Sequence, residues 1–178
     1  MKIKKTKFKD LLILQHKVIK DNRGFFKEVF KKNVLEEELG YTLSFVQKNK
    51  VKSFQNVLRG LHFQLEPYDQ SKLVSVELGE IIDYAVDIRK NSQTYGQCFS
   101  YKLSETCNES LFIPKGFAHG YLTTSKTTLV NYHVDNYYNK TYERGISFND
   151  KFLNINLGVK NENLIISSKD RNLKNFSW

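Results

Sequence analysis

Several kinds of residue and segment are scarce in this chain of 178 residues. Its two cysteines, Cys98 and Cys107, match no metal-site spacing, so we expect two reduced thiols. Two prolines and nine glycines leave no low-complexity linker, which favours a single domain over residues 1–178. No apolar run approaches the roughly 18 residues of a membrane span. No apolar signal segment follows the basic start, so we expect a cytoplasmic protein with no membrane partner.

Acidic residues are also in the minority, and the net charge is +9, from 28 Lys and Arg against 19 Asp and Glu. The lysines are scattered through KIKKTKFK, KEVFKKN and KNKVK rather than gathered in one patch. No recognised nucleic-acid-binding motif accompanies them, so we expect no nucleic-acid partner. A small anionic substrate remains open.

Short runs rich in Val, Ile, Tyr and Phe are abundant, with turn-like residues between them at regular intervals. Examples are LLILQHKVI, GFFKEVF, NVLRGLHFQ, KLVSVELG, EIIDYAVDI and TLVNYHV. This spacing is typical of an all-β sandwich or barrel. The pattern KNVLEEEL predicts one clear helix over residues 32–39, ended by Gly40.

Polar side chains interrupt three of the predicted strands. Strand alternation places Tyr132 on the face that carries the two valines of TLVNYHV, towards the core. Lys72 shares a face with the two valines of KLVSVELG, so it either pairs inside the barrel or extends its amine to the strand end. In NVLRGLHFQ, strict alternation cannot aim both Arg59 and His62 into one cavity. A bulge or bend at Gly60 would re-aim one of them.

The histidines and the remaining polar residues are ordinary when each is considered alone. A lone inward histidine such as His62 is also typical of a hydrogen-bonded core. His119 follows a turn in FIPKGFAHGYL, and at the start of a strand it reads as a capping or surface residue. If six of these residues converge inside one barrel, they would supply a base, a cation, a weak acid and a carboxylate for proton abstraction beside a carbonyl. That set is His62, Lys72, Tyr132, His119, Arg59 and Asp170.

A metal centre is the main competitor on a small β-barrel. A cupin-type cluster needs two histidines one residue apart on a strand, and Gln64 stands where the second would follow His62. Four histidines in the whole chain, at 16, 62, 119 and 133, make a three-histidine centre hard to assemble. We therefore expect no metal and no cofactor.

Seven motifs in order, from about Leu12 to Asp170, resemble the dTDP-4-dehydrorhamnose 3,5-epimerase family of nucleotide-sugar epimerases. They are RGFFKE, FVQKN, NVLRGLHFQ, KLVSVELGE, VDIRK, IPKGFAHGYL and NYY. The resemblance implies an all-β, cupin-like jelly-roll barrel with a few short helices. It also implies epimerisation at C3 and C5 of dTDP-4-dehydro-6-deoxy-D-glucose, for dTDP-L-rhamnose and surface polysaccharide synthesis.

The resemblance also assigns the catalytic positions. His62 would be the proton acceptor, Tyr132 the proton donor, and Asp170 the carboxylate that pairs with the histidine. Lys72 would lie near the C4 oxygen, and His119 beside the sugar.

Substrate-binding positions carry over from the same motifs. Tyr138 would stack on the base, and Arg59 would contact sugar or phosphate. The remaining positions are Arg23, Glu28, Gln47, Lys48, Asn49, Glu143 and Lys169. Lys48 stands where the family often has Asp. We therefore expect altered binding of the nucleotide at this position, unless the protein contacts the nucleotide there through its backbone.

A homodimer is implied as well, with N-terminal strands crossing to the partner so that Arg23 and Glu28 complete the neighbour's site. Such an exchange would use the apolar LLIL and VIKDNRGFF segments, which otherwise leave strand edges open.

Several alternatives stay open. The chain could epimerise only one carbon or use another nucleotide-linked 4-keto sugar. It could instead be a 3,4-ketoisomerase or a non-catalytic nucleotide-sugar-binding cupin.

Overall fold

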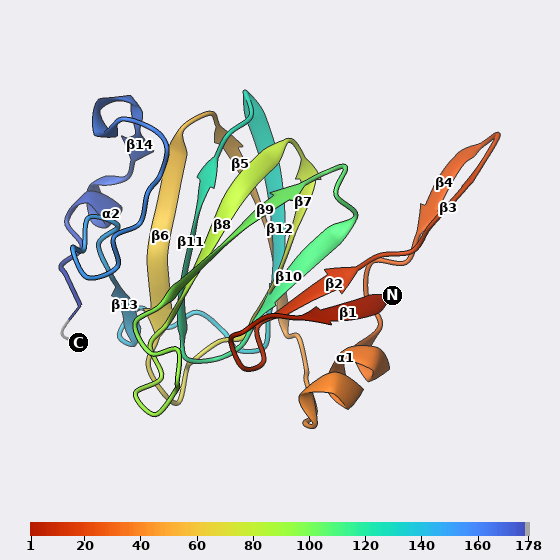
Figure 1. Cartoon of the computed structure of the whole chain (residues 1–178), viewed down its shortest axis with the longest axis horizontal. Helices are drawn as coiled ribbons and strands as arrows, with labels where there is room; N and C mark the ends of the chain where they lie inside the picture. The colour runs from red at the N-terminus through yellow and green to blue at the C-terminus, as the bar shows by residue number, and fades with distance from the viewer. Residues whose placement is uncertain (177–178) are drawn as a thin grey trace.

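Two sheets dominate the computed structural model, which describes residues 1–176 (Figure 1). The first contains, in spatial order, β1 (Lys2–Lys5), β2 (Leu12–Gln15), β10 (Glu109–Ile113), β7 (Lys72–Leu78), β12 (Thr127–Val134) and β5 (Gln47–Phe54). The second contains β13 (Glu143–Gly145), β6 (Val57–Gln64), β11 (Phe117–Thr123), β8 (Glu80–Asp87) and β9 (Cys98–Ser104), with β14 (Ile165–Ile166) beside β6. This architecture confirms the all-β prediction.

The main hydrophobic core fills the space between the two sheets. Val74 and Val130 come from the first sheet, and Ile81, Ala85 and Phe117 come from the second. Each lies on the inward face of its strand, as the period-two pattern predicts. Polar residues on some of the same strands border a cavity beside this core.

The second sheet is covered on its outer face too. Ile146, Phe148 and Leu164, which follow β13 in the chain, pack there against Tyr84 and Leu122. All seven residues of β11 are buried as a result, including the polar His119 and Thr123, so burial does not alternate along this strand. The same packing carries the C-terminal helix α2 (Ser168–Arg171) to the edge of β6.

Helix α1 (Lys32–Leu39) confirms the predicted helix with the predicted bounds. Gly40 ends it in the left-handed conformation at φ +75°, and its N–H donates to the Glu36 carbonyl at 2.8 Å. Leu35 packs on the outer face of the first sheet against Leu12 and Leu73. A 3₁₀ turn, η1 (Asn161–Asn163), precedes β14. No helix in the described range 1–176 is long and apolar enough to cross a membrane.

The N-terminal region contains two different kinds of strand. The expectation that LLIL leaves an open edge is wrong, because β2 lies between β1 and β10 and its apolar side chains are buried. The hairpin of β3 (Val18–Asp21) and β4 (Gly24–Lys27) forms a separate two-stranded sheet that extends away from the body (Figure 1). Its Phe25 and Phe26 are 68% and 65% exposed.

Candidate active site

A cavity of about 550 Å³ lies between the two sheets. Its walls come from β5, β7 and β12 on one side and from β6, β11 and β13 on the other. Of the fourteen predicted site residues, eleven line it: His62, Tyr132, Asp170, Lys72, Gln47, Asn49, Arg59, His119, Tyr138, Glu143 and Lys169. Residues from positions 47 to 170 are thus brought together by the pairing of distant strands.

A bulge in β6 aims two polar side chains into this cavity. His62 pairs with His119, but Arg59 pairs with Tyr121, so three steps along β6 match two steps along β11. Gly60 lies inside the bulge at φ +106°, and a Cβ there would be 2.6 Å from Gly120 Cα. A side chain at this position would therefore collide with the neighbouring backbone. The predicted bulge at Gly60 is confirmed, and it lets Arg59 and His62 line one cavity.

His62 is paired with Asp170. The His62 Nε2 lies 2.8 Å from Asp170 Oδ1, and the Gly60 N–H donates to Asp170 Oδ2 at 3.2 Å. Burial by itself raises the pKa of Asp170, but the hydrogen bonds from His62, Gly60 and Ser167 outweigh it and hold that pKa below its ordinary value. An ionised carboxylate only accepts hydrogen bonds. The Nε2 of His62 therefore carries the proton, and Nδ1 is left as the basic nitrogen.

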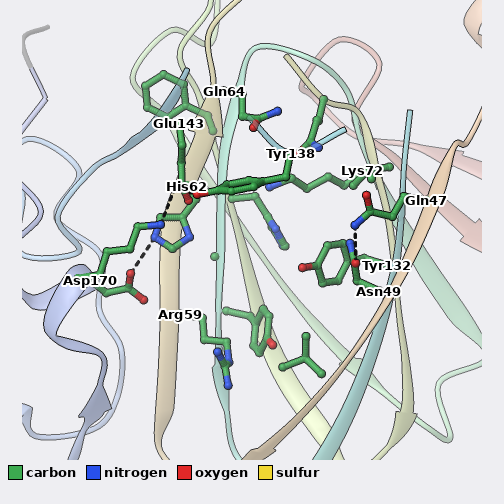
Figure 2. Close-up of a pocket in the computed structure, with 18 of the residues that line it drawn as sticks. Gln47, Asn49, Arg59, His62, Gln64, Lys72, Tyr132, Tyr138, Glu143 and Asp170 are labelled. Carbon is green, nitrogen blue, oxygen red and sulfur yellow. Dashed lines mark hydrogen bonds and ion pairs between the residues drawn. The ribbon is translucent and has the colours of Figure 1, made fainter. Parts of the chain in front are cut away.

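Tyr132 lies on the opposite wall from His62 (Figure 2). It is on β12 in the first sheet, on the face that carries Val130 and Val134, as alternation predicts. Burial raises the pKa of the Tyr132 phenol, and the positive charge of Arg59 opposes that shift only in part. The phenol therefore keeps its proton at neutral pH and can act as an acid.

Lys72 and His119 add a cation and a second imidazole to the walls. Burial lowers the pKa of Lys72 to about 8, against the opposing charges of Asp83 and Glu143. The side chain thus lines the cavity, where the charges of Asp83 and Glu143 act on it, rather than extending to solvent at the strand end. The prediction of a capping or surface role for His119 is wrong, because this residue lies inside β11 and is 7% exposed. Its Nε2 lies 2.9 Å from Asp83 Oδ1.

One end of the cavity holds a connected group of polar side chains (Figure 2). The Tyr138 hydroxyl donates to Glu143 Oε2 at 2.7 Å, and Lys169 Nζ lies 2.6 Å from the same oxygen. Burial raises the pKa of Glu143, but these two partners outweigh it and hold that pKa below its ordinary value. On the first sheet, Gln47 donates to Asn49 Oδ1 at 2.7 Å.

Three predicted binding residues lie outside the cavity of this chain. Lys48 is exposed because alternation along β5 turns Gln47 and Asn49 inward and the residue between them outward. Arg23 and Glu28 lie on and just after the β3–β4 hairpin and do not line the cavity. Arg23 pairs with Asp21 there at 2.6 Å.

The cavity also contains residues that were not predicted as site residues. Gln64 lines it and accepts a hydrogen bond from the Asn139 N–H at 2.6 Å. Its place two residues after His62 on one strand face was a signal for this. Tyr121 lines the cavity from β11, but a strand buried on both faces gives no alternation by which to find it. Among residues 1–176, no group of three or more His, Cys, Asp or Glu is arranged to hold a metal.

Known proteins resemble this chain over almost its whole length. The profile of the dTDP-4-dehydrorhamnose 3,5-epimerase family matches residues 5–177. The enzyme of that name from Shigella flexneri is 47% identical over 176 residues, which cover 99% of this chain and 96% of the relative.

Two solved structures also match. The dTDP-4-dehydrorhamnose 3,5-epimerase of Bacillus anthracis, solved with TDP and PPi bound, is 44% identical and covers 98% of this chain and 99% of its own, with a TM-score of 0.93. The Legionella pneumophila dTDP-6-deoxy-D-glucose-3,5-epimerase was solved in complex with dTDP-4-keto-L-rhamnose and is 41% identical to this chain. The match covers 98% of this chain and 92% of the Legionella chain, with a TM-score of 0.92. This similarity confirms the expected cupin-like fold. The chain belongs to the dTDP-4-dehydrorhamnose 3,5-epimerase family.

Proposed function

We propose that this chain epimerises C3 and C5 of dTDP-4-dehydro-6-deoxy-D-glucose to give dTDP-4-dehydro-L-rhamnose, in the synthesis of dTDP-L-rhamnose. The observation that carries the proposal is one cavity with a histidine base on one wall and a protonated tyrosine on the other. The family and its close relatives support the same reaction. An isomerase of this type transfers protons only, so no redox change occurs.

The first step is removal of a proton from carbon. C3 and C5 both flank the C4 carbonyl, so a C–H bond at either carbon is acidified by the formation of an enolate. His62 Nδ1 accepts the proton, and Asp170 stabilises the resulting imidazolium through Nε2–H. Lys72 faces the enolate oxygen with a positive charge whose effect is stronger in the transition state than in the ground state.

The second step returns a proton from the other side of the sugar. Tyr132 donates its phenolic proton to the carbon as the enolate reverts to the ketone, and the centre is inverted because donor and acceptor lie on opposite walls. His62 then loses its proton to solvent and Tyr132 regains one from solvent, so both residues return to their starting protonation states. The same two residues act on the second carbon after the sugar shifts in the cavity.

The nucleotide would occupy the end of the cavity that holds Tyr138 and Glu143. We assign Tyr138 to stacking on the base, because its ring is more than half exposed at the cavity border. Lys169 and Arg59 supply positive charge for phosphate and sugar oxygens. Gln47 and Asn49 offer amide groups from β5, and Lys48 could contribute only through its backbone or from outside the cavity.

We further propose a homodimer in which the β3–β4 hairpin crosses to the partner. The exposed Phe25 and Phe26 support this, because large apolar side chains on an extended hairpin gain most from burial. Arg23 and Glu28 would then complete the partner's site. We place this single-domain enzyme in the cytoplasm, where its two thiols would stay reduced.

Incubation of the protein with dTDP-4-dehydro-6-deoxy-D-glucose in D2O, followed by NMR, tests the reaction. We expect deuterium at both C3 and C5 and inversion at both. Deuterium at one carbon alone would reduce the activity to a monofunctional epimerase, and a moved carbonyl would make the protein a ketoisomerase. Binding without exchange would leave only a nucleotide-sugar-binding protein.

A further inference from the structure

Asp83 is a buried carboxylate that the proposed reaction does not use. It is 0% exposed and lies on β8, where alternation puts it on the inward face with Ile81 and Ala85 of the main core. Tyr121 is its directly paired neighbour on β11. Burying a carboxylate among apolar residues costs free energy unless its oxygens accept hydrogen bonds or pair with a charge. The burial of Asp83 therefore indicates a specific role.

The contacts of Asp83 point towards His119. Asp83 Oδ1 lies 2.9 Å from His119 Nε2, while Oδ2 is buried and has no hydrogen-bond partner among residues 1–176. Burial lowers the pKa of His119, although Asp83 opposes that shift, so the ring is neutral and carries one proton. Because a carboxylate can only accept, the proton lies on Nε2. The unprotonated Nδ1 is then the nitrogen left for the cavity that His119 lines.

We propose that Asp83 is a positioning residue, which fixes His119 in the Nε2–H tautomer and so presents a hydrogen-bond acceptor, Nδ1, to the substrate. The proposal rests on the proposed function, since it concerns how the same cavity holds the sugar. A bare Nδ1 cannot donate to a carbonyl oxygen, but it accepts from a hydroxyl. His119 therefore selects a sugar hydroxyl, and the C4 carbonyl is left to Lys72.

The position of Asp83 explains why the two wall residues take different roles. The negative charge of Asp83 is the largest influence opposing the lowered pKa of Lys72, which places both cavity residues within its electrostatic reach. The carboxylate behind the wall thus favours a charged donor at Lys72, whereas burial keeps His119 neutral and the contact with Asp83 decides which of its ring nitrogens carries the proton. The substrate class is accordingly a sugar that presents a ketone beside a hydroxyl.

The tautomer can be measured directly by 15N NMR of the histidine side chains, with His119 identified from the signals that are lost in His119→Gln. We expect the wild-type ring to carry its proton on Nε2. In Asp83→Asn the amide can donate as well as accept, so we expect a change in the proton position or a mixture of tautomers. Glu80→Gln is the matched control, because Glu80 is on the same strand but pairs with Lys102 and Thr124 outside the cavity. It should leave the His119 spectrum unchanged.

Turnover supplies the second readout. We expect Asp83→Asn to lower kcat/KM by about tenfold to a hundredfold, as loss of a hydrogen bond in a buried polar site typically does. In a His119→Ala background, the same substitution should cost much less, because the residue through which it acts is absent. An equal loss in both backgrounds, or a wild-type His119 protonated on Nδ1, overturns the inference.

The two proposals fail in different ways. The tautomer measurement needs no substrate, so a His119 ring with its proton on Nδ1 refutes the role of Asp83 even in an active epimerase. A wild-type protein that does not epimerise the sugar refutes the proposed function whatever the tautomer is.

Discussion

Replacement of Gly60 by alanine should damage both the stability and the activity of this protein. The added Cβ would lie 2.6 Å from Gly120 Cα and 2.6 Å from the His119 carbonyl oxygen, both of which are backbone atoms that cannot rotate away. The backbone at φ +106° is also unfavourable for a residue with a side chain. Backbone strain of about 1–3 kcal/mol and overpacking of about 1–3 kcal/mol together predict a loss of roughly 2–6 kcal/mol in the free energy of unfolding.

The loss of activity follows from the same collision. Relief of the contact requires β6 and β11 to separate at the bulge that aims Arg59 and His62. A displacement of about 1 Å in a catalytic group can cost on the order of 100-fold in rate, so we expect a kcat loss of that size. Urea unfolding would give the stability change, and deuterium incorporation from D2O would give the rate.

A matched control is available at Gly40. This residue also has positive φ, at +75°, but a Cβ there would meet nothing within 4 Å. Gly40→Ala should therefore cost only about 1 kcal/mol from the left-handed backbone and should leave turnover unchanged. If Gly60→Ala unfolds within about 0.5 kcal/mol of the wild type and turns over normally, the bulge does not have the role described.

Three further predictions concern the acid, the base and the charges around them. His62→Ala should abolish carbon-bound deuterium exchange, whereas Tyr132→Phe should retain some exchange and block inversion. General acid–base groups contribute about 10²–10⁴-fold to the rate, so both losses should be measurable. Equal behaviour of the two variants would refute their separate roles. Because the Lys72 ammonium, with a pKa of about 8, stabilises the enolate, kcat/KM should fall as the pH rises through about 8 and that group loses its proton; a rate that is flat well above that pH would argue against it. Glu143→Gln should release Lys169 and raise KM for the dTDP-sugar more than it lowers kcat, and a pure kcat effect measured in steady-state kinetics would contradict that assignment.

Much of the fold was predictable because local patterns agree with the final packing. Helix α1 needs only its apolar spacing and the glycine at 40, both of which are local signals. Lys72 and Tyr132 were found by alternation, since β7 and β12 each present one face to the interior between the sheets. Gly60 signalled the bulge because it is the one glycine in its strand.

The parts that were not predicted depend on tertiary packing. The outer covering of the second sheet buries β11 on both faces, so Tyr121 loses the alternation that would have placed it inward, and His119 was assigned to the site through the family resemblance rather than by alternation. Asp83 was visible as an acid in the apolar run EIIDYAVDI, but its partner lies 36 residues further on and only strand pairing shows it. The burial of LLIL depends in the same way on the pairing of β2 with β1 and β10.

The position of the sugar between the base and the acid is the central claim, and a crystal structure with a dTDP-linked 6-deoxysugar tests it most directly. We expect the sugar ring between His62 and Tyr132, with His62 Nδ1 and the Tyr132 hydroxyl approaching its carbons from opposite faces. A sugar bound with both side chains on the same face, or outside the cavity between the two sheets, would contradict the account.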